Sequence, residues 1–312
     1  MRLPDFEPML ATKWPAAFDS EDWWFEVKWD GYRAIVGNTG EGIRARSRRG
    51  LDLAEQFPEL TGVPLPEGVV IDGEIVAFDE TGRPSFSLLQ KRSGFGGAGT
   101  DADVGVNLVV FDLLFRGVDV TGQRYEERRR LLEELELPAP IVVPVPTPER
   151  GVSLFEAVHE QGIEGIVAKR LGSTYRQGRR SPDWRKVSVR HRLRAVVGGY
   201  VPGEGGRAET FGSLLVGLFD DDEFRWIGAV GSGFDEPSLA AFSNALANLE
   251  RPTSPFTNEV RVPQVPVWVE PGIVVAVEYK EWTADSHLRA PVYKGIEIAD
   301  PEGVTWGTEG PS

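Results

Sequence analysis

The sequence of 312 residues contains no cysteine and only three histidines, His159, His191 and His287. Without cysteine, disulfides and cysteine-ligated zinc are excluded, and a cytoplasmic location is the default expectation. The histidines show no metal-ligand spacing. No run approaches the ~20 apolar residues of a membrane span, and the first residues lack a signal-peptide pattern. We therefore expect no membrane partner.

The chain also lacks an excess of positive charge, since its formal net charge is −14 at pH 7. Phosphate binding needs cations, so this acidity argues at first against a nucleic-acid partner. The distribution reverses that conclusion, because residues 163–194 hold ten basic residues against two acidic ones. The ten are Lys169, Arg170, Arg176, Arg179, Arg180, Arg185, Lys186, Arg190, Arg192 and Arg194. Such a stripe predicts a surface for a polyanion, with a solvated basic loop as the alternative.

The length suits two globular domains, and the pattern changes near residue 190. Residues 1–22 contain three prolines and predict an irregular lead-in. After them we expect strands at 23–37, 43–48, 69–78, 106–115, 165–169 and 184–189, and helices at 51–60, 86–93, 124–137 and 153–162, the last capped by Ser153. Helices do not alternate strictly with strands, so the predicted class is α+β, with mixed, largely antiparallel sheets and flanking helices.

From residue 191 onward the sequence offers five or so short strands and one helix, at 237–249. This pattern predicts a small β-barrel such as an OB-fold. The predicted domains are therefore 1–190 and 191–312.

Residues 94–99, Gly-Phe-Gly-Gly-Ala-Gly, match the spacing of a dinucleotide-binding loop. That loop needs a strand before it and a helix after it, whereas here a helix-like run precedes it and a strand follows. We therefore predict a flexible loop. The sequence also lacks a Gly-x₄-Gly-Lys-[Ser/Thr] loop, which excludes a P-loop mechanism.

The stretch from Trp24 to Ala34 places Lys28 at a strand end, directly before a turn at Asp30 and Gly31. An amine is a nucleophile only when it is deprotonated, and nearby cations such as Arg33 lower its pKa. Taken alone, the stretch also fits a β-hairpin with an exposed lysine. The four-residue pattern Lys-x-Asp-Gly is too short to decide between these interpretations.

Further motifs follow Lys28-Trp-Asp-Gly31 in a fixed order. They are Ser47-Arg48-Arg49-Gly50, Asp72-Gly73-Glu74, Leu108-Val-Val-Phe-Asp112, Glu164-Gly-Ile-Val-Ala-Lys169 and Trp184-Arg-Lys186. The ordered set resembles that of covalent nucleotidyltransferases and is most similar to bacterial ATP-dependent DNA ligases, particularly the ligase module of bacterial end-joining systems. The resemblance runs from residue 6 to about 297, and its late segments, 277–283 and 288–295, resemble that family's barrel domain.

The resemblance implies covalent chemistry at Lys28, which would attack the α-phosphorus of ATP, form a lysyl-AMP phosphoramide and release pyrophosphate. Phe111 would stack on adenine, a contact worth roughly 1–3 kcal/mol. Glu26 would lie against the adenine edge, through its backbone. Phe111 lies in an apolar run and, taken alone, would be interpreted as a core residue. Its predicted role therefore depends on its occurrence together with the other motifs.

The resemblance also implies ligands for the sugar, the phosphates and a metal ion. Four basic residues would hold the ribose and the phosphates: Arg33, Arg48, Lys169 and Lys186. The last two would neutralise the α-phosphate, because phosphoryl transfer depends mainly on positioning and charge neutralisation. Glu74 and Glu164 would bind the ribose hydroxyl or Mg²⁺, with Mn²⁺ as a second option, since such ions prefer carboxylate oxygens.

Two departures from the family pattern concern the leaving group. Ser188 stands where a second lysine usually follows the first by two residues, and Gly295-Ile296 is followed by Glu297 instead of the basic barrel motif. An acidic residue there would repel pyrophosphate. Arg289 and Lys294 are nearby candidates to compensate.

These observations predict a monomeric, ATP-dependent DNA ligase that seals nicks in duplex DNA during repair. Its barrel would contact the duplex without reading sequence, and end-joining or excision-repair partners would be separate chains. Two alternatives stay open. An RNA ligase or capping-type nucleotidyltransferase would prefer RNA ends or label with GTP, and a catalytically impaired DNA-end-binding protein would never form an adduct.

Overall fold

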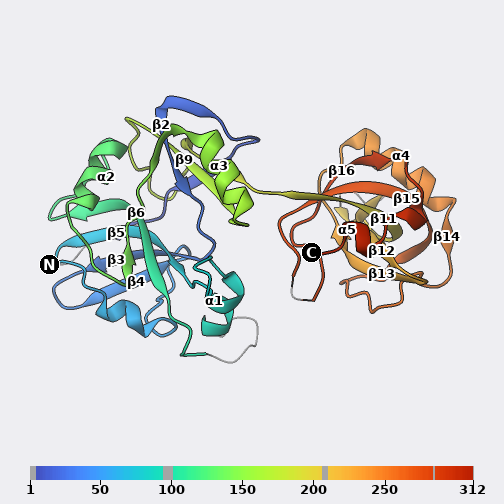
Figure 1. The fold of residues 1–312 in the computed structure, drawn as a ribbon, viewed down its shortest axis with the longest axis horizontal. Helices are drawn as coiled ribbons and strands as arrows, with labels where there is room; N and C mark the ends of the chain where they lie inside the picture. The colour runs from blue at the N-terminus through green and yellow to red at the C-terminus, as the bar shows by residue number, and fades with distance from the viewer. Residues whose placement is uncertain (1–4, 94–100, 206–209, 284, 312) are drawn as a thin grey trace. The chain divides into compact units, whose positions relative to one another are not determined.

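The computed structural model describes residues 5–93, 101–205, 210–283 and 285–311 (Figure 1). Its internal contacts divide the chain into two compact units, Met1–Val189 and Arg190–Ser312. Each unit has a hydrophobic core of its own. Within the described ranges, no helix is both long and apolar enough to cross a membrane.

The described part of unit 1 contains two five-stranded sheets, and the first has the strand order β1-β10-β9-β2-β8. Strand β1 pairs with β10 in parallel, whereas the other neighbours are antiparallel. The strands are β1 (Leu10–Lys13), β2 (Asp19–Val27), β8 (Thr147–Arg150), β9 (Gly165–Arg170) and β10 (Arg180–Ser188). Helix α3 (Gly151–Glu160) lies against β2 and β9 in Figure 1 and buries Val158 with Phe25 and Ile166.

The second sheet of unit 1 has the order β4-β3-β5-β6-β7. Its strands are β3 (Tyr32–Asn38), β4 (Ile43–Ser47), β5 (Val69–Val76), β6 (Asn107–Arg116) and β7 (Ile141–Val142). A turn of 3-10 helix, η1 (Pro58–Gly62), and helices α1 (Phe86–Ser93) and α2 (Tyr125–Glu133) flank it. Leu60, Leu89 and Leu132 of these helical segments join the core of this sheet.

A separate apolar cluster connects the two sheets of unit 1. Phe111 of β6 and Trp184 of β10 meet in it with their rings nearly perpendicular, 6.3 Å between centroids. Tyr175 packs edge-on against Trp184 at 5.7 Å, and Met9 is fully buried beside them. Aromatic pairs in this geometry add to the free energy gained by burial. The cluster therefore fixes the spacing of β6 and β10, which border the site described below.

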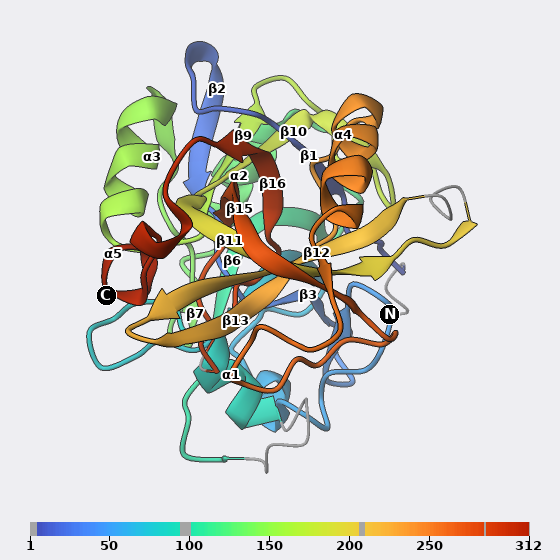
Figure 2. The ribbon, with the colours of Figure 1, turned by 90° about the vertical axis from the view of Figure 1, so that its right-hand side faces the viewer.

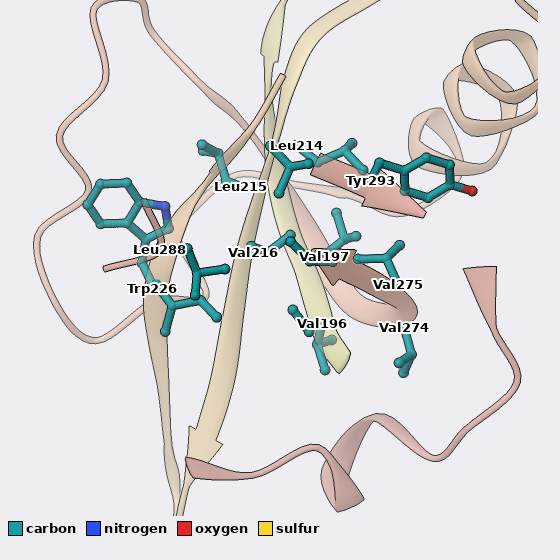
Figure 3. Close-up of a cluster of buried hydrophobic side chains, with 14 of the residues drawn as sticks. Val196, Val197, Leu214, Leu215, Val216, Trp226, Val274, Val275, Leu288 and Tyr293 are labelled. Carbon is teal, nitrogen blue, oxygen red and sulfur yellow. The ribbon is translucent and has the colours of Figure 1, made fainter. Parts of the chain in front are cut away.

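Unit 2 is an OB-like domain with the strand order β13-β12-β11-β15-β14, and β16 pairs with β15, beside which it lies in Figure 2. The strands are β11 (His191–Pro202), β12 (Phe211–Asp220), β13 (Glu223–Val230), β14 (Glu250–Arg251), β15 (Val267–Tyr279) and β16 (Val292–Glu297). Three helical segments accompany them in the described part, α4 (Glu236–Ala247), η3 (Pro301–Gly303) and α5 (Trp306–Glu309). Buried valines and leucines of β11, β12 and β15 belong to one hydrophobic cluster, part of which Figure 3 shows.

A glycine allows the sheet of unit 2 to curve tightly around its aromatic residues. A β-carbon at Gly198 would lie 2.6 Å from the rings of both Phe224 and Phe256. The pairing of β11 shifts register at this point, between Val197 and Gly199. Bulges with glycine are the usual means of bending a strand in a small barrel.

Most of the predicted elements are confirmed, as is the α+β class with an OB-like second unit. The helix predicted at 86–93 is α1, and the strands predicted at 69–78 and 106–115 are β5 and β6 with ends shifted by one or two residues. The expected loop at 94–99 lies outside the described residues.

The prediction of an irregular lead-in at 1–22 is wrong. Residues 10–13 form β1, and residues 19–22 already belong to β2. Pro8 and Pro15 lie outside both strands, so they do not interrupt the ladder. The backbone of Leu10 donates to Arg179 O at 2.9 Å, so a partner distant in sequence turns this segment into a strand.

The hairpin suggested by Asp30 and Gly31 is also wrong, because β2 and β3 belong to different sheets. The backbone groups of β2 are used by β8 and β9, and the amide of Lys28 donates to Gly165 O at 2.8 Å. No edge of β2 is left for β3. The chain therefore passes from one sheet to the other immediately after Lys28.

Two helix predictions need correction. Residues 51–60 form only the short η1, because the amide of Leu53 bonds to Ala45 O on the neighbouring strand. Helix α3 begins at Gly151, before Ser153, and the carboxylate of Asp19 accepts the amide of Val152 at 2.9 Å. Asp19 of β2 thus accepts the hydrogen bond from a free amide of the first helical turn, in place of a capping side chain next to the helix.

Candidate active site

A pocket in unit 1 lies between the two sheets and gathers most of the residues that the motifs single out. Its lining includes eight of the nine predicted site residues, whereas Glu164 lies outside the lining and contacts Lys28; the eight are Glu26, Lys28, Arg33, Arg48, Glu74, Phe111, Lys169 and Lys186. They come from β2, β3, β5, β6, β9 and β10, and from the segments that follow β2 and β4. Side chains two apart in a strand share a face, which explains the pairs Trp184 and Lys186, and Val167 and Lys169.

Lys28 lies at the end of β2 and its ammonium donates to Glu164 Oε2, forming an ion pair. The two side chains are 21% and 12% exposed, so the pair is sheltered but open to a small ligand. Gly165, next to Glu164, has φ +142°, and a β-carbon there would lie 2.1 Å from Val187 O. Only glycine fits this position, so the local backbone fixes where Glu164 meets the lysine.

A buried network surrounds Glu26. Its Oε2 lies 2.8 Å from Lys169 Nζ, and the hydroxyl of Tyr125 donates to its Oε1. Lys169 also donates to the carbonyl oxygen of Phe111 at 2.8 Å and is 1% exposed. Burial lowers the pKa of Lys169, an effect opposed by the charge of Glu26, and burial together with Glu26 raises the pKa of Tyr125 well above its usual value. Lys169 therefore lies beside Phe111, at the end of the pocket where the resemblance places adenine.

Arg33 is held by a second buried network. Its Nε and Nη2 donate to the two carboxylate oxygens of Asp72 at 2.5 and 2.6 Å, and Tyr175 donates to the same carboxylate at 2.5 Å. Its guanidinium carbon lies 4.4 Å from the centroid of the Phe111 ring, a cation–π contact. Burial acts to lower the pKa of Arg33, but the charge of Asp72 outweighs it and the net shift is upward. Arg33 therefore stays charged and supports the ring of Phe111.

Glu74 is the one residue of the pocket whose carboxyl titrates near neutrality. Burial raises its pKa to about 7, opposed by the charges of Arg33 and Lys28 and reinforced by those of Asp72 and Glu164. Two carboxylates close enough to affect each other are suitable ligands for a hard divalent cation. In the described part of the chain no group of three or more acidic, histidine or cysteine residues could hold a metal ion. A metal here would need oxygen ligands from a bound phosphate as well.

The cations at the other end of the pocket have no acidic partners. Lys186, Arg180 and Arg48 all line the pocket, and none of them forms an ion pair with a residue that the structure describes. Burial lowers the pKa of Lys186, and the charges of Lys28 and Arg180 lower it further. The pocket thus has a neutralised, aromatic end and a cationic end, as a nucleoside phosphate requires.

The motifs did not indicate several residues that build this site. Tyr125 and Tyr175 orient Glu26 and Asp72 across 99 and 103 positions of sequence, and no local pattern marks either of them. Trp184 and Arg180 border the pocket from β10. The sequence did mark these two indirectly, because Trp184 belongs to the motif of Lys186 and Arg180 to the basic stripe, but neither was predicted to line the pocket.

The fold is that of a nucleotidyltransferase domain followed by an OB-like domain, and two family models agree with it. Residues 8–188 match the ATP dependent DNA ligase domain, and residues 207–298 match the ATP dependent DNA ligase C terminal region. The chain belongs to the ATP-dependent DNA ligase family. The order and spacing of its motifs are therefore those of an enzyme family, as the resemblance indicated.

Characterised relatives include the multifunctional non-homologous end joining protein LigD of Mycolicibacterium smegmatis, 35% identical over 98% of this chain and 40% of that protein. The multifunctional non-homologous end joining DNA repair protein LigD of Mycobacterium tuberculosis is 37% identical over 93% of this chain and 38% of that protein. The chain thus spans about 40% of the length of these relatives. The crystal structure of the ligase domain of M. tuberculosis LigD is 35% identical, covers 96% of this chain and 98% of that domain, and superposes with a TM-score of 0.56.

Proposed function

We propose that this chain is an ATP-dependent DNA ligase that seals nicks in duplex DNA through a lysyl-AMP intermediate. The observation that carries the proposal is the position of Lys28, ion-paired with Glu164 in a pocket that has an aromatic end and a cationic end. A related mycobacterial DNA ligase D, 35% identical to this chain, has a solved structure in complex with ATP. The same chemistry therefore suits this pocket.

In the first step the nitrogen of Lys28 attacks the α-phosphorus of ATP. The new bond is N–P, the bond that breaks joins the α-phosphorus to the bridging oxygen, and pyrophosphate leaves with that electron pair. Lys28 must first lose a proton, and Glu164 is the carboxylate in contact with its ammonium. AMP then passes to the 5′-phosphate at the nick, and the 3′-hydroxyl displaces AMP to join the strands.

The aromatic end of the pocket would hold the adenine. Phe111 presents a ring whose position is fixed by Arg33 and by Trp184. Glu26 and Lys169 are paired with each other beside it, and Tyr125 holds the other oxygen of Glu26. We therefore assign Lys169 to the adenine end instead of the α-phosphate, and little ordering remains when the base binds. This arrangement supports a purine nucleotide as the substrate.

Glu74 and Glu164 fit a divalent cation in the form that Mg²⁺ prefers, with one or two carboxylates and the oxygens of the substrate phosphates. When bound there, Mg²⁺ would supply charge neutralisation at the phosphates, and Mn²⁺ would serve similarly. The residues of the chain itself bind and orient the nucleotide. Lys186 and Arg48, which both line the pocket, would bind the phosphates and the ribose as cations.

We infer that the partner of the reaction is nicked duplex DNA, and that the enzyme works in repair by end joining or excision repair, as its LigD relatives do in end joining. Protein partners would be found among the other components of such a pathway. The reaction consumes ATP and acts on DNA, so we place it in the cytoplasm. We propose residues 1–190 as the adenylation domain, 191–312 as the barrel, and a monomer as the working form.

The departure at Glu297 carries less weight in the structure than in the sequence. Arg192 donates to its carboxylate at 2.7 Å, so its charge is paired within unit 2. The two candidates to compensate for it, Arg289 and Lys294, are themselves paired, with Glu281 and with Glu278. The pairing of Glu297 reduces its repulsion of pyrophosphate and favours an active enzyme, whereas the pairing of Arg289 and Lys294 leaves them less available to compensate.

The test is incubation with α-labelled ATP and Mg²⁺, then with labelled GTP, followed by denaturing electrophoresis. We expect an acid-labile adduct from ATP alone, absent in Lys28→Ala, and sealing of a nicked duplex. Labelling from GTP would favour a capping-type enzyme, and preference for RNA ends an RNA ligase. No adduct with either nucleotide would leave the DNA-end-binding alternative.

A further inference from the structure

Strand β10 contains Ser188, which stands where the family pattern has a second lysine. Trp184, Lys186 and Ser188 follow each other at intervals of two, and the first two line the pocket. Residues two apart on a strand share a face, so Ser188 lies on the same face, opposite Gly165 on β9. A neutral hydroxyl therefore takes the position of a cation on this side of Lys186.

The neighbouring strand β1 supplies a cation on the other side of Lys186. The two strands are parallel, and Lys13 is the register partner of Lys186. The amide of Trp14 donates to Lys186 O at 2.9 Å, which fixes this register. Register partners on adjacent strands place their side chains on one face, so Lys13 lies beside Lys186, exposed and just outside the residues that line the pocket.

Two lysines side by side are unfavourable unless an anion lies between them. In the ranges that the structure describes, neither Lys13 nor Lys186 has an acidic partner within ion-pair distance. Besides burial, the charges of Lys28, Arg180 and Lys13 each lower the pKa of Lys186. The charge of Glu164 opposes these effects and raises the pKa of Lys186.

Arg180 completes the group at the start of β10. It lines the pocket, and its guanidinium donates to the carbonyl oxygen of Ala11 on β1. That contact orients one side of the guanidinium, and among the described residues no acidic partner is bound to its other donors, which can serve a ligand. Arg180, Lys13 and Lys186 thus form a cationic rim on two paired strands of one sheet, next to the nucleophile.

We propose that Lys13, with Arg180 and Lys186, binds the β- and γ-phosphates of ATP and stabilises the departing pyrophosphate, so that β1 supplies the cation that Ser188 does not. This inference rests on the proposed function. In the step concerned the N–P bond to Lys28 forms, the bond from the α-phosphorus to the bridging oxygen breaks, and the electron pair leaves on pyrophosphate. Cations placed where that charge develops lower the barrier.

The first test measures adenylylation alone, with labelled ATP and no DNA, over a range of ATP concentrations. We expect kcat/KM for ATP to fall about tenfold in Lys13→Ala, as for a single partly solvated charge contact, and to stay near the wild-type value in Lys13→Arg. Adding Ser188→Lys to Lys13→Ala should restore activity, because it returns a cation to the other side of Lys186. The matched control is Lys91→Ala, an exposed lysine on α1, whereas Lys13 is the register partner of Lys186.

A second measurement reads the leaving group directly. Wild-type and variant proteins are first charged with AMP, and pyrophosphate is then added to reverse the step. Lys13→Ala should need a higher pyrophosphate concentration for half-maximal reversal, again by about tenfold, whereas a merely structural effect of the substitution would leave this concentration unchanged. Thermal melts of each variant verify that the fold is retained.

A third arm separates ATP phosphates from DNA phosphates, using a nicked duplex that already carries AMP on its 5′-phosphate. Lys13→Ala should seal this substrate at the wild-type rate. Loss of sealing with normal adenylylation would mean that the rim binds DNA, and would overturn the inference. An unchanged adenylylation rate in Lys13→Ala would overturn this inference but not the proposed function. Absence of any adduct in the wild type would overturn both.

Discussion

Replacing Glu74 by glutamine should make the metal-free protein more stable at pH 8 and change little at pH 4. The carboxyl has a pKa of about 7 in the folded protein against 4.5 as its ordinary value, because burial disfavours its charged form. Between these two values the folded protein holds a proton that the unfolded chain has released. Stability therefore falls as pH rises from about 4.5 to 7, and above 7 the loss is complete. Glutamine carries no charge and escapes this loss.

The size of the effect follows from the two pKa values. A change from 4.5 to about 7 corresponds to about 3 kcal/mol if the carboxyl is fully ionised at the end of the titration. The side chain is only half-buried, and solvent screens part of the interaction, so we expect a gain of about 2 kcal/mol at pH 8. For a unit of this size that gain raises the melting temperature by about 4–8 °C.

The assay is thermal unfolding of wild type and Glu74→Gln from pH 4.5 to 8.5 with a chelator present. The difference between the two proteins, rather than either melting temperature, is the quantity of interest, since other groups titrate equally in both. The matched control is Glu55→Gln, an exposed carboxyl on the same unit outside the pocket lining. A difference that is independent of pH, or that decreases toward pH 8, would refute the reasoning.

Three further predictions concern activity and packing. Adenylylation should decline as pH falls from 8 to 6, because protonation of Glu74 removes a carboxylate from the pocket; a flat profile of adduct formation would contradict this. Arg128→Ala should destabilise unit 1 by about 3–5 kcal/mol in urea melts, because it leaves the fully buried Asp112 without the guanidinium that contacts it at 2.7 and 2.8 Å; a cost below about 1 kcal/mol would show that the pair contributes little. Gly198→Ala should lower the stability of unit 2 by about 1–3 kcal/mol, since its methyl group would overlap the Phe256 ring; an unchanged melt would show that the ring moves aside.

The sequence was sufficient to predict which residues line the pocket, but not which residues hold them in position. The motif residues carry chemistry that few other contexts explain, and their order placed Lys28, Glu74 and Phe111 in one site before any contact was known. Tyr125 and Tyr175 could not be predicted, because a tyrosine that orients a carboxylate 99 or 103 positions away looks like any other. Their contribution exists only in the tertiary structure.

The error at β2 and β3 has a related cause. The residues at Asp30 and Gly31 favour a turn, and the local pattern is compatible with a hairpin. Which strand pairs with β2 depends on β9, more than a hundred residues later, whose backbone reaches Lys28 at Gly165. Local propensity therefore specified the strands correctly and left their partners undetermined.

The parallel pairing of β1 with β10 has a consequence for the synthesis of the protein. Thr12 Oγ1 donates to Ser181 O across 169 positions of the chain, so the wall of the pocket that contains β1 forms only after β10 has been made. A ribosome that has produced Lys28 and all the strands up to β9 still holds a chain without a closed pocket. Under the proposed function, an unfinished chain therefore lacks one wall of the nucleotide pocket, and we expect Lys28 to accept AMP only after nearly the whole of unit 1 has left the exit tunnel.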